Sequence, residues 1–296
     1  MHGWTCSGYK TVVRTRRRRL RLVLPALAAT LVAAITAAGC TSGDAPQRTS
    51  PDVSARPRTM AALGDSITRG YAACGRGGDC VDASWATGTV EDVASHRQRL
   101  GADRTGEDNL AVSGARVGGL ATQARAAVRA RPDYVTVLIG ANDACASDEA
   151  AMTSVEEFTD AFDEAVDVLL RGLPDARVLV VSVPDLLRLW QVGKDRPDVV
   201  QVWQSTGVCR SMLADPTDTS AEAQARRDRV RGRVQAYNAV MATACARYAP
   251  RCRHDGNAVF DYRFHLDDVS TVDYWHPSER GQATLAKIAW EAGFWP

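Results

Sequence analysis

The 39 residues before Cys40 contain no acidic residue, although seven basic residues lie there. The rest of the chain therefore holds 29 basic and 35 acidic residues, a net charge of −6. Nucleic-acid binding depends on a basic surface, so this mildly acidic body argues against a nucleic-acid partner. Internal repeats are also missing, and only one segment has the composition of a linker, which favours a single folded domain.

The basic run Arg14–Arg21 precedes a mostly apolar stretch, Leu22–Gly39. This layout is typical of a secretory signal, although the stretch is long for one and marginal for a membrane span. Ala37-Ala38-Gly39-Cys40 resembles the lipobox of bacterial lipoproteins, except that the lipobox prefers leucine at the position of Ala37. We expect residues 1–39 to be a signal peptide and Cys40 to be lipidated, which would anchor the protein to the outer face of the cell membrane. Cleavage nearby with secretion and an uncleaved anchor are the alternatives.

Cys-x-x-Cys pairs are absent, and His254 has no matching cluster of ligands around it in the sequence, so a zinc site is disfavoured. An even number of cysteines in an exported chain favours disulfides, and six cysteines follow Cys40. Fifteen pairings are possible, and buried free thiols are the alternative. Because two pairs enclose short loops, we expect Cys74–Cys80, Cys245–Cys252 and the long-range bridge Cys145–Cys209.

Thr41–Arg58 is rich in Ser, Thr, Pro and Asp and has no periodic apolar face. Residues 40–58 are therefore expected to form a flexible tether. The domain would then occupy residues 59–296, which is long enough to bury a full core.

Apolar runs alternate with amphipathic stretches along this domain. The strands predicted from the apolar runs are Thr59–Leu63, Asn109–Val112, Tyr134–Ile139, Arg177–Val183 and Ala258–Phe260. The helices predicted from periodicity are Val90–Leu100, Leu120–Arg131, Val155–Arg171, Ala221–Tyr248 and Glu279–Glu291. Alternation of strand and helix predicts an α/β fold, a three-layer α/β/α sandwich with a mostly parallel sheet.

Ser66 follows the first apolar run, within Gly64-Asp65-Ser66, where a buried strand gives way to a turn. Rigid backbone would hold its hydroxyl at the mouth of the sheet, beside free N–H groups. Near the C-terminus, Asp273 precedes His276 by three residues, so its carboxylate can accept the Nδ1 proton and leave the other ring nitrogen for a serine. Either motif alone also fits an ordinary turn or a surface histidine.

Two further loops after predicted strands could stabilise an oxyanion. Asn109–Gly114 ends in a glycine whose N–H can approach a cleft closely, and Gly140-Ala141-Asn142-Asp143 offers the Asn142 side-chain amide. Taken singly, each is more often a turn. Asp65 and Asp143 are assigned to local hydrogen bonding, and His96, His254 and His265 to surface or core positions.

In this order the four blocks resemble those of the SGNH hydrolases, also called GDSL esterases and lipases. The resemblance spans about residues 59–288 and implies a flavodoxin-like fold. It implies that Ser66 is the nucleophile, His276 the base and Asp273 the orienting carboxylate. The oxyanion hole would consist of the Ser66 and Gly114 N–H groups and the Asn142 side chain. The Gly-x-Ser-x-Gly elbow of α/β-hydrolases is absent, which disfavours that family.

These features favour an exported carboxylic ester hydrolase that acts on small-molecule or lipid esters, with fatty-acyl esters preferred, and that needs no metal or organic cofactor. A carbohydrate O-deacetylase of the same fold and a surface lipoprotein that binds without turnover are the alternatives. Trp85, Trp203 and the segment Leu186–Trp190 are candidates for an acyl-binding cleft, although such residues more often pack in a core. Acyl-chain length and oligomeric state do not follow from the sequence.

Overall fold

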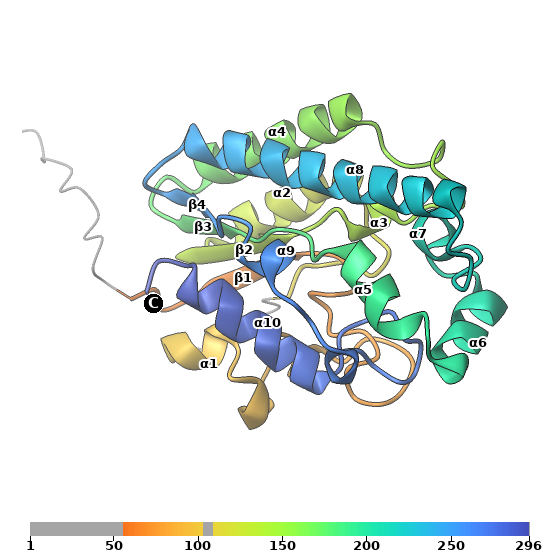
Figure 1. Ribbon diagram of the computed structural model, residues 1–296. Coiled ribbons are helices and arrows are strands. Elements are labelled where there is room, and N and C mark those ends of the chain that lie inside the picture. Colours follow the sequence, from red (N-terminus) through yellow and green to blue (C-terminus); the bar gives the residue numbers. More distant parts are fainter. Residues whose placement is uncertain (1–55, 103–108, 296) are drawn as a thin grey trace, which may run out of the picture. The chain divides into compact units, whose positions relative to one another are not determined.

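The computed structural model describes residues 56–102 and 109–295 (Figure 1). The expected signal peptide, Cys40 and most of the expected tether lie outside the described residues. Within the described ranges, no helix combines the length and the apolar character that crossing a membrane requires.

Four parallel strands form the sheet in the order β1-β2-β3-β4. The strands are β1 Met60–Gly64, β2 Tyr134–Leu138, β3 Arg177–Val180 and β4 Cys252–His254. Every residue of β1 and β2 is buried, as expected for strands that are covered on both faces. Met60 lies opposite Tyr134, and Gly64 lies opposite Leu138 at the carboxyl ends of the two strands.

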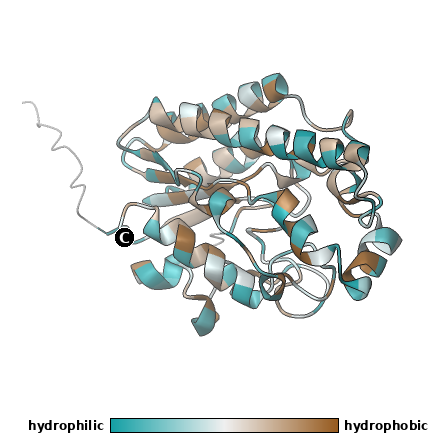
Figure 2. Ribbon diagram, viewed as in Figure 1, coloured by the Kyte–Doolittle hydropathy of each residue, from teal (hydrophilic) through white to brown (hydrophobic). Residues whose placement is uncertain are grey.

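Helices cover both faces of this sheet, so the predicted α/β/α arrangement is confirmed. One layer contains α2 Leu120–Ala130, α4 Val155–Gly172 and α8 Ala221–Ala246, and the other contains α1 His96–Leu100 and α10 Glu279–Glu291 (Figure 1). Hydrophobic and hydrophilic residues alternate along α4, α8 and α10 (Figure 2), as helices with one buried face require. Phe158 of α4 stacks on Tyr237 of α8 with ring centroids 4.1 Å apart.

Shorter helices connect these layers at the carboxyl ends of the strands. They are α3 Ala141–Ala144, α5 Leu186–Gly193, α6 Pro197–Thr206, α7 Arg210–Leu213 and α9 Ala258–Asp261. Single 3₁₀ turns are formed by Val81–Ala83, Glu91–Val93, Val117–Gly119 and Leu266–Asp268.

The strand prediction for Ala258–Phe260 is wrong, because these residues begin α9. Asp255 accepts hydrogen bonds from the N–H groups of Asn257 and Val259, and Asn257 adopts a left-handed φ of 70°, so the chain turns into a helix. The fourth strand is Cys252–His254, which pairs with β3.

Two other predictions need correction. Asn109–Val112 lies beside β1, where the N–H groups of Leu110 and Val112 donate to Ala62 and Gly64, but it forms only a single bridge and not a strand. The expected helix Val90–Leu100 is interrupted, because Ala94 has a left-handed φ of 47° and Ser95 begins α1 with a capping box that includes Gln98.

All three expected disulfides are present: Cys74–Cys80, Cys145–Cys209 and Cys245–Cys252. The Cys145–Cys209 bridge joins the residue after α3 to the residue before α7, so it braces a connection of 64 positions near the carboxyl ends of the strands.

Candidate active site

Ser66 lies in the turn that leaves β1, with 6% of its surface exposed. Gly64 ends the strand with a φ of +149°, and a Cβ there would come within 2.2 Å of the Leu138 carbonyl oxygen. Only glycine therefore allows the chain to turn this close to β2. Gln123 of α2 fixes the turn, since its side chain accepts from the Gly64 N–H and donates to the Gly64 carbonyl.

Asp273, His276 and Ser66 form a continuous chain of side-chain hydrogen bonds. His276 Nε2 lies 2.9 Å from Ser66 Oγ, and His276 Nδ1 lies 2.6 Å from Asp273 Oδ2. Asp273 Oδ1 also accepts the backbone N–H groups of Trp275 and His276. Burial alone would raise the pKa of Asp273, but the hydrogen bonds and charge of His276 and these N–H groups hold it below the ordinary value.

The loop that carries His276 is fixed on several sides. Val269 and Pro277 form an antiparallel bridge, and the Ser270 N–H donates to the His276 carbonyl at 2.8 Å. Tyr274 occupies a left-handed conformation with a φ of 49°. The Tyr71 ring contacts the imidazole, with the centroids of the two rings 4.6 Å apart. These contacts hold the imidazole beside Ser66.

Gly114 lies in a turn closed by a hydrogen bond from the Ala115 N–H to the Val112 carbonyl, and it adopts a φ of +80°. Asn142 follows β2 on α3 and donates one side-chain N–H to the Ala115 carbonyl at 3.0 Å. Within the described part of the chain, the N–H groups of Ser66 and Gly114 donate to no protein acceptor. They are therefore free to bind an anion.

Two buried carboxyl groups lie next in sequence to Ser66 and Asn142. Asp65 accepts the Ile67 N–H through Oδ1, but its buried Oδ2 has no hydrogen-bond partner. Burial, helped by the nearby charge of Asp143, raises the pKa of Asp65 to about 7. Asp143 accepts hydrogen bonds from the Val117 N–H and the Thr153 hydroxyl, and burial raises its pKa as well. Both carboxyl groups therefore accept hydrogen bonds from the turns and loops around them, which agrees with the role assigned from the sequence.

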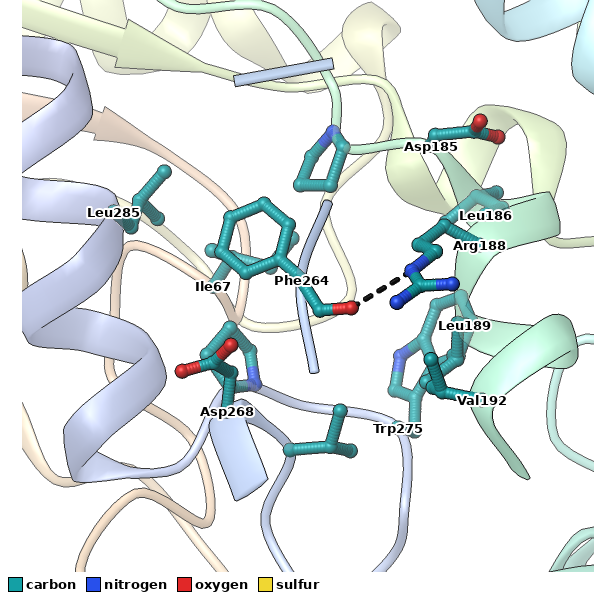
Figure 3. Close-up of a pocket in the computed structure, with 13 residues that line it drawn as sticks. Ile67, Asp185, Leu186, Arg188, Leu189, Val192, Phe264, Asp268, Trp275 and Leu285 are labelled. Carbon is teal, nitrogen blue, oxygen red and sulfur yellow. Dashed lines mark hydrogen bonds between the residues drawn. The ribbon is translucent and has the colours of Figure 1, made fainter. Parts of the chain in front are cut away.

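An apolar cavity of about 70 Å³ lies against residues adjacent in sequence to Ser66 and His276. Its lining residues are Ile67, Pro184, Asp185, Leu186, Arg188, Leu189, Val192, Phe264, Asp268, Val269, Trp275, Pro277 and Leu285. In Figure 3 the Arg188 guanidinium donates to the Phe264 carbonyl oxygen, and Leu285 lies on the side of the Phe264 ring opposite Arg188.

Of the two alternatives for Trp85 and Trp203, core packing is the one that the structure shows. Trp85 and Trp203 are at most 1% exposed and pack in the core, where Trp203 Nε1 donates to the Tyr274 carbonyl. Within the segment Leu186–Trp190, Leu186, Arg188 and Leu189 line the cavity and Trp190 does not. Trp275, which the sequence did not single out for this role, lines it instead.

The other histidines that the structure describes, His96, His254 and His265, form no hydrogen bond with Ser66, Asp273 or His276. His96 is fully buried with Nδ1 3.0 Å from the Tyr134 hydroxyl, and His265 is exposed. Among the described residues, no group of three or more His, Cys, Asp or Glu side chains could hold a metal ion.

Tyr71 and Asp79, which no sequence motif indicates, both contact groups of the site. Tyr71 packs on the imidazole, and Asp79 accepts a hydrogen bond from Ser113, the neighbour of Gly114. Neither belongs to a motif. Asp79 lies inside the loop that the Cys74–Cys80 disulfide closes, and Tyr71 lies three residues before that loop. Only the pairing of that disulfide hinted at a fixed loop here.

The sequence model of the GDSL-like Lipase/Acylhydrolase family matches residues 62–284. The chain therefore belongs to this family, and the expectation of a GDSL-type ester hydrolase is confirmed at the level of the family.

A curated relative is the membrane-associated phospholipase B1 of Rattus norvegicus, 31% identical over an alignment that covers 45% of this chain and 12% of the relative. Among solved structures, an extracellular lipase from Streptomyces rimosus is 19% identical (79% of this chain, 99% of that chain, TM-score 0.47). Phospholipase A1 from Streptomyces albidoflavus NA297 is 17% identical (79% and 98%, TM-score 0.49). An acetyl xylan esterase from Geobacillus stearothermophilus is 18% identical (80% and 95%, TM-score 0.46). The family assignment depends on the family model and not on these distant structures.

The raised pKa of Asp65 predicts a pH-dependent stability. Between about pH 4 and pH 7 the folded carboxyl holds a proton that the unfolded one has lost, so the free energy of unfolding falls as pH rises through this window. Asp65→Asn keeps an acceptor for the Ile67 N–H and removes the titration. We expect denaturant unfolding at pH 5 and pH 8 to differ less in this variant than in the wild type. In the control Asp195→Asn, at an exposed position, the difference in the free energy of unfolding between pH 5 and pH 8 should equal that of the wild type. An unchanged difference in Asp65→Asn would contradict the raised pKa of Asp65.

Proposed function

We propose that this chain is a serine-dependent carboxylic ester hydrolase that acts on lipid or fatty-acyl esters through an acyl-enzyme intermediate. The observation that carries the proposal is the hydrogen-bonded chain from Asp273 through His276 to Ser66. A serine hydroxyl is a weak nucleophile until an adjacent base accepts its proton, and a base works best when a third group fixes its orientation. All three groups are within hydrogen-bonding distance.

In the proposed reaction, Ser66 Oγ attacks the ester carbonyl carbon while His276 Nε2 accepts the hydroxyl proton. Asp273 stabilises the resulting imidazolium through Nδ1, and its lowered pKa keeps it ionised for this role. The imidazolium then protonates the departing alcohol oxygen, which leaves an acyl group on Ser66. Water, deprotonated by His276, attacks this acyl-enzyme, releases the carboxylic acid and restores the serine.

The negative oxygen of each tetrahedral intermediate needs donors that are already in position. The free N–H groups of Ser66 and Gly114 are assigned to this role, together with the second side-chain N–H of Asn142. Its first N–H, which donates to Ala115, fixes the amide relative to the Gly114 turn.

The preference for fatty-acyl esters is supported by the apolar cavity. Ile67 follows Ser66, and Trp275 and Pro277 flank His276, so the cavity shares its walls with the segments that carry the reacting groups. Its wall is formed mostly by apolar side chains, as the recognition of an acyl chain requires. The name of the phospholipase B1 relative is consistent with a lipid ester, although the aligned part makes up only 12% of that protein.

We also infer that residues 1–39 direct export, that lipidation of Cys40 anchors the protein, and that residues 40–58 separate the anchor from a catalytic domain at 59–296. The three disulfides support this location, because such bonds form and persist in oxidising compartments.

A fluorophosphonate probe tests the nucleophile. We expect the wild-type protein to be labelled covalently at Ser66, and both labelling and ester hydrolysis to disappear in Ser66→Ala with the melting temperature preserved. Ser205→Ala, an exposed serine of α6, is the control and should be labelled as the wild type is. A folded wild-type protein that remains unlabelled would contradict the proposal and favour a binding protein without turnover.

Filling the cavity tests the substrate class. Leu189→Trp places a larger side chain in the wall of the cavity, so kcat/KM should fall at least about tenfold for a dodecanoyl p-nitrophenyl ester and remain nearly unchanged for the acetyl ester. Gln201→Trp, on the exposed surface of α6, is the control. A wild-type protein that prefers acetylated sugars to long-chain esters would instead favour the carbohydrate O-deacetylase.

A further inference from the structure

Asp79 lies immediately before Cys80, at the end of the loop that the Cys74–Cys80 disulfide closes. Its Oδ1 accepts a hydrogen bond from Ser113 Oγ at 2.5 Å, and its Oδ2 accepts one from Arg69 Nε at 2.8 Å. Each oxygen of this carboxylate therefore accepts one short hydrogen bond, one from a guanidinium and one from a hydroxyl group. Both bonds are exposed to solvent, so they orient Arg69 and Ser113 more than they add to the free energy of unfolding.

Through Ser113 and Arg69, Asp79 is connected to both ends of the segment 109–114. Ser113 lies near its end, and Arg69 also donates through Nη1 to the Asn109 carbonyl at its start. Arg69 itself follows Ser66 by three residues, in the same turn. Through these contacts Asp79 connects the turn that carries Ser66 to the segment 109–114.

The segment ends in the turn that presents the Gly114 N–H. Ser113 and Gly114 are the two central residues of this turn, which the Ala115 N–H closes on Val112. Nothing lies within 4 Å of the place where a Cβ of Gly114 would be. Packing therefore does not fix the glycine, and the direction of its N–H depends on the hydrogen bonds around it. Besides the backbone bonds of Val112 and Ala115, these are two side-chain bonds, Asp79–Ser113 on one side and Asn142–Ala115 on the other.

We propose that Asp79 is a positioning residue for the oxyanion hole: it holds Ser113, and thereby aims the Gly114 N–H at the oxygen that becomes negative. The inference rests on the proposed function, since it assumes that Gly114 donates to that oxygen. Asp79 touches no reacting atom. A misdirected donor weakens binding of the transition state more than binding of the substrate, so the loss falls on kcat and not on KM.

Asp79 could also act through its charge, because its carboxylate interacts electrostatically with His276. The two mechanisms differ in what Ser113 does. Charge stabilisation of the imidazolium requires Asp79 alone, whereas positioning requires the Asp79–Ser113 pair. A double-mutant cycle on the two residues separates them.

The experiment compares Asp79→Ala, Ser113→Ala and the double variant with the wild type on one p-nitrophenyl ester, over a range of pH. We expect each single variant to lower kcat about tenfold with KM nearly unchanged, and the double variant to be no slower than the slower single variant. The pH dependence of kcat/KM should keep its acidic limb. Asp79→Asn, which still offers Ser113 an acceptor, should recover part of the loss. Asp82→Ala, an aspartate bonded to Thr89, is the control.

Three outcomes would overturn the proposal. Losses that multiply in the double variant would show that the two residues act separately. A slow Asp79→Ala with a shifted acidic limb, beside a normal Ser113→Ala, would assign the effect to charge on His276. Unchanged kcat with a lowered melting temperature would assign Asp79 to stability alone. Failure of the proposed function is distinguishable, because the wild-type protein would then show no labelling at Ser66.

Discussion

The hydrogen bond between His276 Nε2 and Ser66 Oγ joins residues 210 positions apart, and much of the fold serves to make it possible. Ser66 leaves the carboxyl end of β1, which is buried between two helical layers and held in register by β2. His276 enters from the loop before α10, where a backbone bridge and the Trp203 side chain restrain its neighbours. The turn that carries Ser66 and the loop that carries His276 are therefore brought together by the packing of the helical layers on the sheet.

Carboxyl groups within this region have opposite electrostatic environments. Asp273 is surrounded by donors from His276 and two N–H groups, so hydrogen bonding outweighs burial and its pKa is lowered. Asp65 is more deeply buried and has one oxygen without a partner, so burial prevails and its pKa is raised to about 7. Asp273, which has the donors, is thus the carboxylate that the proposed acyl transfer requires to be ionised, while Asp65, in the turn of Ser66, is largely neutral below neutral pH.

The sequence predicted the elements whose pattern is local. β1 and β2 are continuous apolar runs, α4 and α10 have clear caps and periodicity, and the short loops between cysteines pointed to the correct disulfides. Ser66 and His276 were identified because their neighbouring residues form motifs. β4 was missed because Cys-Arg-His has no apolar run, and its pairing with β3 depends on tertiary contacts. Trp85 and Trp203 stayed open between core and cavity, with core favoured, because nothing local distinguishes a core tryptophan from one that lines a cavity.

The most direct test of the account is a kinetic cycle on Ser66 and His276. If the two side chains transfer one proton between them, they act as a unit, and removing either disables the same step. The account predicts that Ser66→Ala and His276→Ala each lower kcat about 10⁴-fold or more, and that the double variant is no slower than the single ones. Losses that multiply in the double variant, or a Ser66→Ala variant that retains wild-type turnover, would contradict it.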